Sequence, residues 1–241
     1  MLRLSDLKTD LRSMGSSEKA KVLQRFFKTG PGEYGEGDIF IGVKVPDLRK
    51  TAKKYQKITL NETKELLNSK IHEERLVSTL ILIQKFNNAS LKEKGELVKY
   101  YLDNTQKINN WDLVDLSAPQ IIGEYLKDKQ DRTILYKLAE SNNLWDRRIS
   151  IITTLTFIRN NQFSDTIKIS QTLLNDKHDL IQKAVGWMLR EVGKRDIATE
   201  ERFLRKHSQK MPRTMLRYAI ENFSSDKRLT YLNKPPKSDA K

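Results

Sequence analysis

The sequence of 241 residues contains no cysteine. Disulfides, thiolate-bound zinc, iron–sulfur clusters and a cysteine nucleophile are therefore excluded. The three histidines, His72, His178 and His207, lie far apart in the sequence, so they form no histidine-rich metal motif. We expect each of them to be an ordinary surface or partly buried residue.

Long hydrophobic runs are also absent. No apolar segment approaches the roughly 20 residues that a membrane-spanning helix needs. The first fifteen residues contain acidic side chains and no apolar signal core. The sequence therefore predicts a cytoplasmic protein with no membrane partner.

Acidic residues are few compared with basic ones. The chain has 31 Asp and Glu against 45 Lys and Arg, which gives a formal net charge of +14. Such an excess favours a polyanionic partner, with nucleic acid ahead of an acidic membrane. The alternative is a soluble protein with many surface lysines.

Proline is scarce, with 6 in the chain, and apolar residues recur at helical spacing almost throughout. We expect a first helix from about Leu4 to Met14, and a second with Ser17 as its N-cap that ends at Gly30. A further helix opens with Pro46 in its first turn.

A glycine-rich loop separates the second and third expected helices. It holds half of the ten glycines, and no Gly-Lys-Ser/Thr follows, so it is not a Walker phosphate loop. These glycines are Gly30, Gly32, Gly35, Gly37 and Gly42.

An internal repeat follows this loop. Long apolar-striped helices start near His72, Asn110, Trp145, Leu180 and Pro212, and a shorter amphipathic helix precedes most of them. Helix pairs at a spacing of roughly 32 to 38 residues indicate HEAT-like repeats. We therefore predict an all-α fold, an α-solenoid of HEAT-like helical repeats with a concave basic groove.

The same pattern predicts the domain organisation. Residues 1–223 are expected to form a single HEAT-like repeat domain. Residues 224–241 are polar, basic and proline-bearing, so we expect a tail that is partly disordered.

The segment NNWDLVDLSAP combines an aromatic and an acidic residue on one helix face. Trp111 and Asp115 are four residues apart, so one lies above the other. Pro119 cannot donate to the carbonyl of Asp115, and the helix should be kinked or opened there. Asp112 is expected to be a cap or surface carboxylate. The alternative is that Asp115 only complements the helix dipole and that Trp111 belongs to the core.

A second tryptophan lies on a basic face. Ile181, Val185, Met188, Leu189 and Val192 share the apolar side of one expected helix. At about 100° per residue, Trp187 falls on the other side, together with Lys183, Arg190 and Lys194. An aromatic among cations suits a phosphate backbone beside a base or sugar. The alternative is that Trp187 packs on a neighbouring helix.

An arginine lies inside another apolar stripe. Trp145, Ile149, Ile152 and Leu155 form that stripe, and Arg148 falls within its arc, whereas Arg147 lies off it. Such an arginine usually has an anionic partner, which is either a carboxylate of this chain or a bound phosphate.

A carboxylate between indoles is suited to stabilising a cation. In a basic groove that cation could be a purine alkylated at N3 or N7, whose glycosidic bond breaks through a cationic, oxocarbenium-like sugar. A carboxylate near C1′ would stabilise that sugar and orient the attacking water, as in sugar hydrolases.

At these residues the sequence resembles the DNA alkylation repair (AlkD-like) family of HEAT-repeat DNA glycosylases. The resemblance extends from about Leu23 to Phe223. It is carried, in this order, by the segments FIGVKVPDLRK, NNWDLVD with the following proline, NNLWDRR, LIQKAVGWMLRE and MPRTMLRYAIE.

The resemblance implies hydrolytic removal of N3- and N7-alkylated purines from double-stranded DNA, without metal or cofactor. It implies a monomer that associates with the nucleoid of a bacterial-type cell when bound to DNA. The implied catalytic residues are Asp115, Trp111 and Trp187. The implied contact to the DNA backbone is Arg148. Lys183, Arg190 and Lys194, which share the basic face with Trp187, are also expected to bind DNA, and so is Arg213.

The sequence departs from the family pattern near its N-terminus. Phe26 or Phe27 stands where the family has a tyrosine, and the glycine-rich loop that holds Tyr34 is longer. Two other functions stay open from the residues alone. One is a non-catalytic HEAT-repeat scaffold that binds nucleic acid or an acidic protein, and the other is a membrane-surface adaptor.

Overall fold

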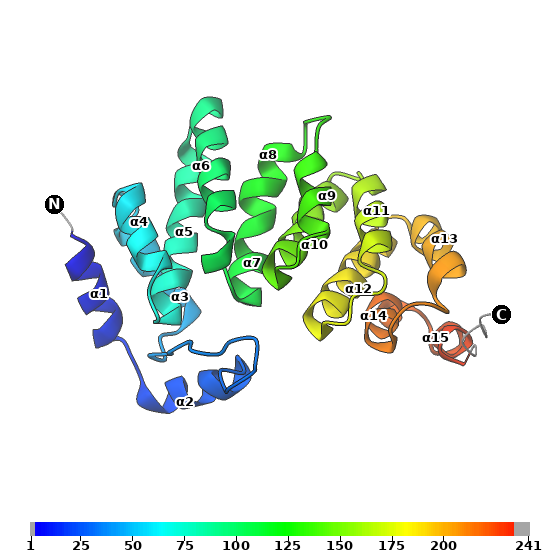
Figure 1. The fold of residues 1–241 in the computed structure, drawn as a ribbon, viewed down its shortest axis with the longest axis horizontal. Helices are drawn as coiled ribbons and strands as arrows, with labels where there is room; N and C mark the ends of the chain where they lie inside the picture. Colours follow the sequence, from blue (N-terminus) through cyan, green and yellow to red (C-terminus); the bar gives the residue numbers. More distant parts are fainter. Residues whose placement is uncertain (1–2, 234–241) are drawn as a thin grey trace. The chain divides into compact units, whose positions relative to one another are not determined.

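The computed structural model describes residues 3–233, and this part of the chain is helical and contains no strand. Ile39 and Ile71 form an isolated parallel bridge. The chain divides into two compact units, Met1–Ser117 and Ala118–Lys241, called unit 1 and unit 2 below. Figure 1 labels the helices of each unit. The all-α prediction is thus confirmed for the described residues.

Unit 1 is built around α5, whose buried residues include charged and polar side chains as well as aliphatic ones. Helices α3 and α4, which precede it in the chain, pack against it. The chain leaves the unit within α7. The helices are α1 (Leu4–Ser13), α2 (Ser17–Phe26), α3 (Val45–Lys54), α4 (Leu60–Leu67), α5 (His72–Asn88), α6 (Leu91–Asp103), a 3-10 turn (Thr105–Lys107) and α7 (Trp111–Ala118).

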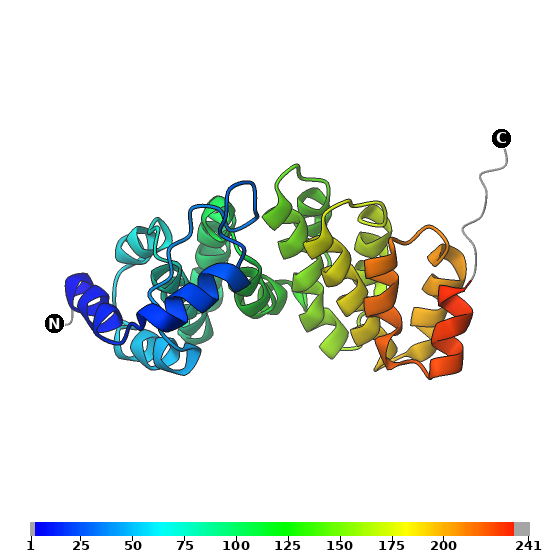
Figure 2. The same cartoon turned by 90° about the horizontal axis from the view of Figure 1, so that it is seen from below.

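Unit 2 repeats a layout of one helix followed by a second that packs on its neighbours. Helix α12 packs against α10 and α14, and the three lie side by side in Figure 2. The helices are α8 (Glu124–Leu126), α9 (Thr133–Ala139), α10 (Leu144–Arg159), α11 (Ser164–Thr172), α12 (Asp179–Gly193), α13 (Ile197–His207), α14 (Arg213–Ala219) and α15 (Ser225–Leu232). A π-helical turn (Pro119–Gly123) precedes them, and a 3-10 turn (Ile220–Asn222) follows α14.

The apolar stripes predicted for α10 and α12 are confirmed. Trp145, Ile149, Ile152 and Leu155 are all buried in α10. In α12 the five predicted core residues are fully buried. Whether the helix pairs form one HEAT-like solenoid domain over residues 1–223 stays a prediction.

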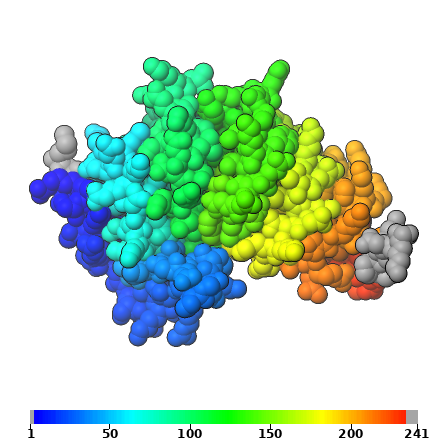
Figure 3. Space-filling view, in the orientation of Figure 1, coloured from blue at the N-terminus to red at the C-terminus, as the bar shows by residue number. Residues whose placement is uncertain are grey.

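The glycine-rich loop is held against the start of α5. Glu73 is buried, and its carboxylate accepts hydrogen bonds from the backbone N–H groups of Ile41, Gly42 and Val43. Gly42 has a φ of 81°, and a Cβ there would lie 2.2 Å from the carbonyl oxygen of Ser16. Only glycine fits this approach. In Figure 3, α2 and the loop form the lower edge of unit 1.

The second helix differs from the prediction at both ends. Ser16, not Ser17, is the N-cap, and its hydroxyl accepts a hydrogen bond from the N–H of Lys19. The helix stops at Phe26 and does not reach Gly30. Lys28 takes a left-handed conformation with φ of 50°, which turns the chain into the loop.

The first part of the expected tail is ordered, since Ser225–Leu232 form the helix α15. The end of the tail, residues 234–241, lies outside the described residues. Within residues 3–233 no helix is both long and apolar enough to cross a membrane.

Candidate active site and nucleic-acid-binding residues

Trp111 and Asp115 lie one turn apart on the outer side of α7. Both side chains are half-buried, whereas Leu113 and Val114 of the same helix are fully buried. The structure therefore keeps Asp115 accessible and does not seal it into the core. This is the placement that a carboxylate needs if it is to act on a bound molecule.

The regular helix ends at Ala118, one turn after Asp115, as its sequence predicts. Pro119 has no N–H for the carbonyl of Asp115, and Pro119–Gly123 form a π-helical turn. Thr156 of α10 donates its hydroxyl hydrogen to the carbonyl oxygen of Pro119 at 2.7 Å. A Cβ on Gly123 would lie 2.6 Å from the Thr156 hydroxyl oxygen, so a glycine is needed for this contact.

The ring of Trp111 lies in an aromatic cluster. It stacks on Phe27 with ring centroids 5.1 Å apart and planes only 8° from parallel. Phe26 meets it edge-on at 5.9 Å and is itself 61% exposed. Phe27 also stacks on Phe40 at 4.8 Å. One face of the indole is thus covered by Phe27, and Phe26 and Phe27 together set the position of Trp111.

A buried polar network lies beneath this cluster, around His72. The His72 ring stacks on Phe40 and is 1% exposed. Its Nε2 lies 2.8 Å from Asp112 Oδ2 and its Nδ1 lies 3.2 Å from Asp38 Oδ2. Arg75 donates to the same Asp38 oxygen at 2.6 Å. The network joins the glycine-rich loop and α5 to the first turn of α7.

The network holds its charges through mutual compensation. Burial would lower the pKa of His72, but Asp112 and Asp38 outweigh burial and raise it. Burial would raise the pKa of Asp38, but His72 and Arg75 outweigh it and lower the pKa. The contacts of His72 with Asp38 and Asp112 tie the glycine-rich loop to the start of α7 and so help to fix Trp111.

Neither His72 nor Asp112 behaves as its sequence suggests. His72 is buried, not a surface or partly buried residue, because two carboxylates and two aromatic rings enclose it. Asp112 is more than a cap or a surface carboxylate, because one of its oxygens contacts His72. Asp38 and Asp112 lie 34 and 40 residues from His72 in the chain, so no local spacing indicates the contact.

Tyr101 lies behind Asp115 in the core. Its hydroxyl is 2.8 Å from Ser117 Oγ, and its ring is fully buried. Burial raises the pKa of Tyr101 first, and the negative charge of Asp115 raises it further. The tyrosine therefore stays neutral beside the carboxylate.

Trp187 lies on α12 in unit 2 and is half-buried. Its indole Nε1 donates to Glu191 Oε1 at 3.1 Å, and Lys194 Nζ lies 2.7 Å from the same oxygen. The carboxylate therefore fixes the indole edge and partly neutralises Lys194. Spacing of four residues along α12 could have indicated the Trp187–Glu191 contact.

The other predicted DNA-binding residues in unit 2 also contact this chain. Lys183 Nζ lies 2.6 Å from Asp179 Oδ2, and Arg190 pairs with Glu221. The buried Arg148 donates to the carbonyl oxygen of Leu180 at 2.6 Å, and the exposed Arg213 donates to that of Leu232 at 2.8 Å. Binding of a phosphate backbone would exchange some of these internal contacts for external ones.

One protein family has a model that matches most of this chain. The model of the DNA alkylation repair enzyme family matches residues 7–223. The chain belongs to this family. Among solved structures, it resembles a protein described as a predicted DNA alkylation repair enzyme from Enterococcus faecalis. That likeness has a TM-score of 0.69 at 18% identity and covers 88% of this chain and 98% of the other, so it concerns the fold. A comparison with curated proteins gave no match.

No group of three or more His, Asp or Glu side chains within residues 3–233 is arranged to hold a metal ion. The candidate functional side chains come from two helices. These are the carboxylate and indole of α7 and the indole and cations of α12.

Proposed function

We propose that this protein is a DNA glycosylase. It hydrolyses the N-glycosidic bond of positively charged N3- or N7-alkylated purines in double-stranded DNA. Membership of the DNA alkylation repair enzyme family supports DNA as the partner and repair of alkylation damage as the task. In this proposal the helix pairs form a HEAT-like solenoid with a concave basic groove.

The observation that carries the proposal is the setting of Asp115. A half-buried carboxylate lies one turn after a tryptophan held by stacked aromatic rings, and one turn before a helix opening. In a chain of formal charge +14, a carboxylate there would repel phosphate, and a site that only binds polyanion gains nothing from it.

The reaction itself is a hydrolysis. The bond between C1′ and the purine nitrogen breaks, and its electron pair leaves with the base, which becomes neutral. The sugar develops positive charge, which the Asp115 carboxylate opposes. Water then bonds to C1′ and loses a proton to Asp115 or to solvent. The indole of Trp111 attracts cationic base or sugar, at about 0.5–2 kcal/mol for such a contact.

Residues of unit 2 are assigned supporting roles. Trp187 is proposed as the second indole, and its hydrogen bond to Glu191 would fix its ring for this task. Arg148, Lys183, Arg190, Lys194 and Arg213 are proposed to contact the phosphate backbone.

A base-release assay tests the proposal against the scaffold alternative. Purified protein is incubated with methylated duplex DNA in the presence of a chelator, and free 7-methylguanine is measured. We expect release by the wild-type protein and only a small fraction of that release by Asp115→Asn, with DNA affinity of the variant equal or higher. Binding of DNA without any base release would instead support a non-catalytic nucleic-acid scaffold.

The phosphate contacts have their own test. Arg148→Ala and Lys183→Ala should each weaken duplex binding whatever the sequence, and flatten its salt dependence by about one unit of slope for each lost contact. Lys137→Ala, on the exposed side of α9, is the matched control. Because Arg148 is buried, its variant is first checked for an unchanged melting temperature. Unchanged salt slopes in both variants would move the DNA contacts elsewhere.

A further inference from the structure

A groove runs between α11 and α13 in unit 2. It encloses about 560 Å³, which is ample for a mononucleotide. It is formed by the first helices of two neighbouring pairs, whereas the residues proposed for base excision lie mainly on second helices. Both helices contribute cationic and apolar side chains to its lining.

The groove is lined by cations and by no carboxylate. Lys168, Arg202 and Lys206 are exposed, and none of them forms an ion pair with a residue of the described range. The field of these cations is therefore open to an external anion.

The nearest acidic side chains are engaged elsewhere. Asp165 on α11 pairs with Arg132 at 2.7 Å and accepts the hydroxyl of Tyr136 at 2.6 Å. Asp196 caps α13 by accepting the N–H of Thr199. Glu201 on α13 pairs with Arg205 and Lys227. None of the three lines the groove. The pKa of Asp196 is lowered first by its hydrogen bonds to Thr199 and also by the charge of Arg202. Asp196 therefore offsets part of that charge, which leaves Lys168 and Lys206 as the main cations of the groove.

Apolar and aromatic side chains form the rest of the lining. Phe203 is buried at 4% exposure, and the His207 ring lies 4.6 Å from it. Phe163 and Ile167 add half-buried apolar surface from α11. Phe163 is also the N-cap residue of α11 and provides no side-chain cap. A base or sugar can lie on such surface, while cations and an uncapped helix start attract phosphate.

The pKa of His207 reflects its burial and the positive charges near the groove. Burial lowers the pKa of His207, and the positive charges of Lys206 and Lys210 lower it further. Gln171 Nε2 lies 3.4 Å from the His207 Nε2 atom across the groove. An anion bound between these groups would oppose the lysine charges and so raise the pKa of His207.

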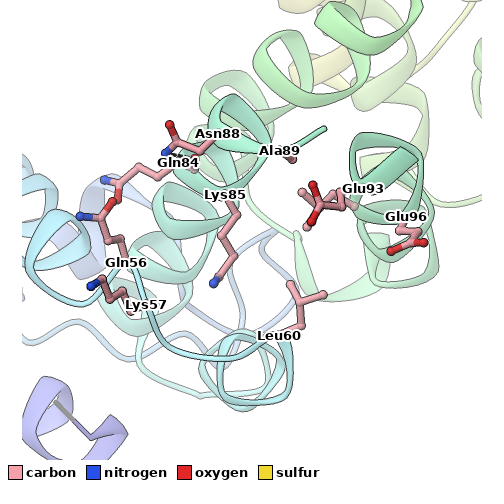
Figure 4. Close-up of a pocket in the computed structure, with 10 residues that line it drawn as sticks. Gln56, Lys57, Leu60, Gln84, Lys85, Asn88, Ala89, Glu93 and Glu96 are labelled. Atoms are coloured by element: carbon pink, nitrogen blue, oxygen red, sulfur yellow. Dashed lines mark hydrogen bonds between the residues drawn. The ribbon is translucent and has the colours of Figure 1, made fainter. Parts of the chain in front are cut away.

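A cavity of similar size in unit 1 is lined by charges of both signs. Figure 4 shows Lys85 of α5 at its centre, with Glu93 and Glu96 of α6 on another side. Lys57 adds a second cation, so two cations face two carboxylates. Mixed charges of this kind give no net preference for an anion, whereas the charged residues that line the α11–α13 groove are all cationic.

We propose that the groove between α11 and α13 binds a nucleoside phosphate, either as a free nucleotide or as one nucleotide of a single-stranded nucleic acid. Lys168, Arg202 and Lys206 hold the phosphate, and the apolar lining with the His207 ring holds the sugar and base. The proposal does not depend on base excision, because no residue of this groove has a role in that reaction.

The test compares two charge-matched double variants of the full chain. Lys168→Gln/Lys206→Gln alters the groove, and Lys53→Gln/Lys92→Gln removes the same charge from exposed positions in unit 1. Binding of dAMP, deoxyadenosine, inorganic phosphate and a labelled single strand is measured by calorimetry or fluorescence anisotropy. Nuclear magnetic resonance follows the His207 imidazole during the dAMP titration, with His207→Asn to assign its signal.

We expect saturable dAMP binding, weaker binding of phosphate and none of deoxyadenosine. The groove variant should weaken dAMP binding at least about tenfold, the control variant should not, and dAMP should shift the His207 signal. Single-strand binding that falls in the groove variant identifies the strand as the source, and an effect on dAMP alone identifies the free nucleotide. Base release from methylated duplex should be equal in both variants.

Three results would overturn the proposal. They are an absence of saturable dAMP binding, equal weakening by both double variants, and binding to anionic lipid vesicles but not to dAMP. Each can occur whether or not the protein excises bases, so failure here and failure of the proposed glycosylase are separable.

Discussion

Replacement of Glu200 by glutamine should stabilise the protein, and by an amount that depends on pH. Glu200 lies on α13 and is 1% exposed, and its Oε1 has no hydrogen-bond partner among the described residues. Its Oε2 approaches Gly193 so closely that a Cβ there would overlap it. Burial and then the charge of Glu201 raise the pKa of Glu200 to about 8.

The size of the effect follows from this shift. A carboxyl with a higher pKa in the folded protein binds a proton there that the unfolded chain has already released. The contribution of this carboxyl to the free energy of unfolding is therefore fully present below its ordinary pKa of 4.5 and is lost as the pH rises toward 8. At about 1.4 kcal/mol for each pKa unit, the loss by pH 7 is about 3 kcal/mol. Glutamine carries no such penalty.

Urea unfolding from pH 4 to pH 9, followed by tryptophan fluorescence, measures this directly. The free energy of unfolding of Glu200→Gln should match that of the wild type near pH 4 and exceed it by about 3 kcal/mol at pH 7. Glu140→Gln, at an exposed position in unit 2, should show no such divergence. A difference between Glu200→Gln and wild type that stays constant with pH would refute the reasoning.

Two further predictions concern unit 1. The raised pKa of His72 stabilises the fold below its ordinary value of 6.5, and this stability is lost as the pH rises through the raised value; His72→Gln should abolish that part of the pH dependence of unfolding. Phe27→Ala removes a buried ring stacked on Trp111 and Phe40, so it should cost about 3–5 kcal/mol and change the Trp111 emission. Emission and melting temperature equal to the wild type would show that this stack does not hold the indole.

The helices and their apolar faces could be predicted from the sequence because the signals are local. Apolar residues recur along α12 at most four positions apart, and its five predicted core positions are fully buried. The opening after Asp115 also has a local cause, since proline lacks the N–H that the helix needs. The half-buried position of Trp111 and Asp115 on one face of α7 follows from the same periodicity.

The network around His72 could not be predicted because its parts are distant in the chain. Asp38 lies beside His72 because the glycine-rich loop is held against α5 by Glu73 and by the bridge between Ile39 and Ile71, and these contacts are equally non-local. The partners of the proposed DNA-binding cations differ in this respect. Asp179 lies four residues before Lys183, so helical spacing alone indicates that pair. Glu221 is distant from Arg190, and only the fold brings them together.

The single-turnover rate of 7-methylguanine release tests the central role of Asp115 most directly. Asp115→Asn is compared with Asp128→Asn, which changes the same charge at an exposed position. Loss of a transition-state stabiliser of this kind costs about 2.7–4 kcal/mol, so release by Asp115→Asn should be roughly 100- to 1,000-fold slower. The Asp128 variant should keep the wild-type rate. Equal rates for Asp115→Asn and the wild-type protein would contradict the account.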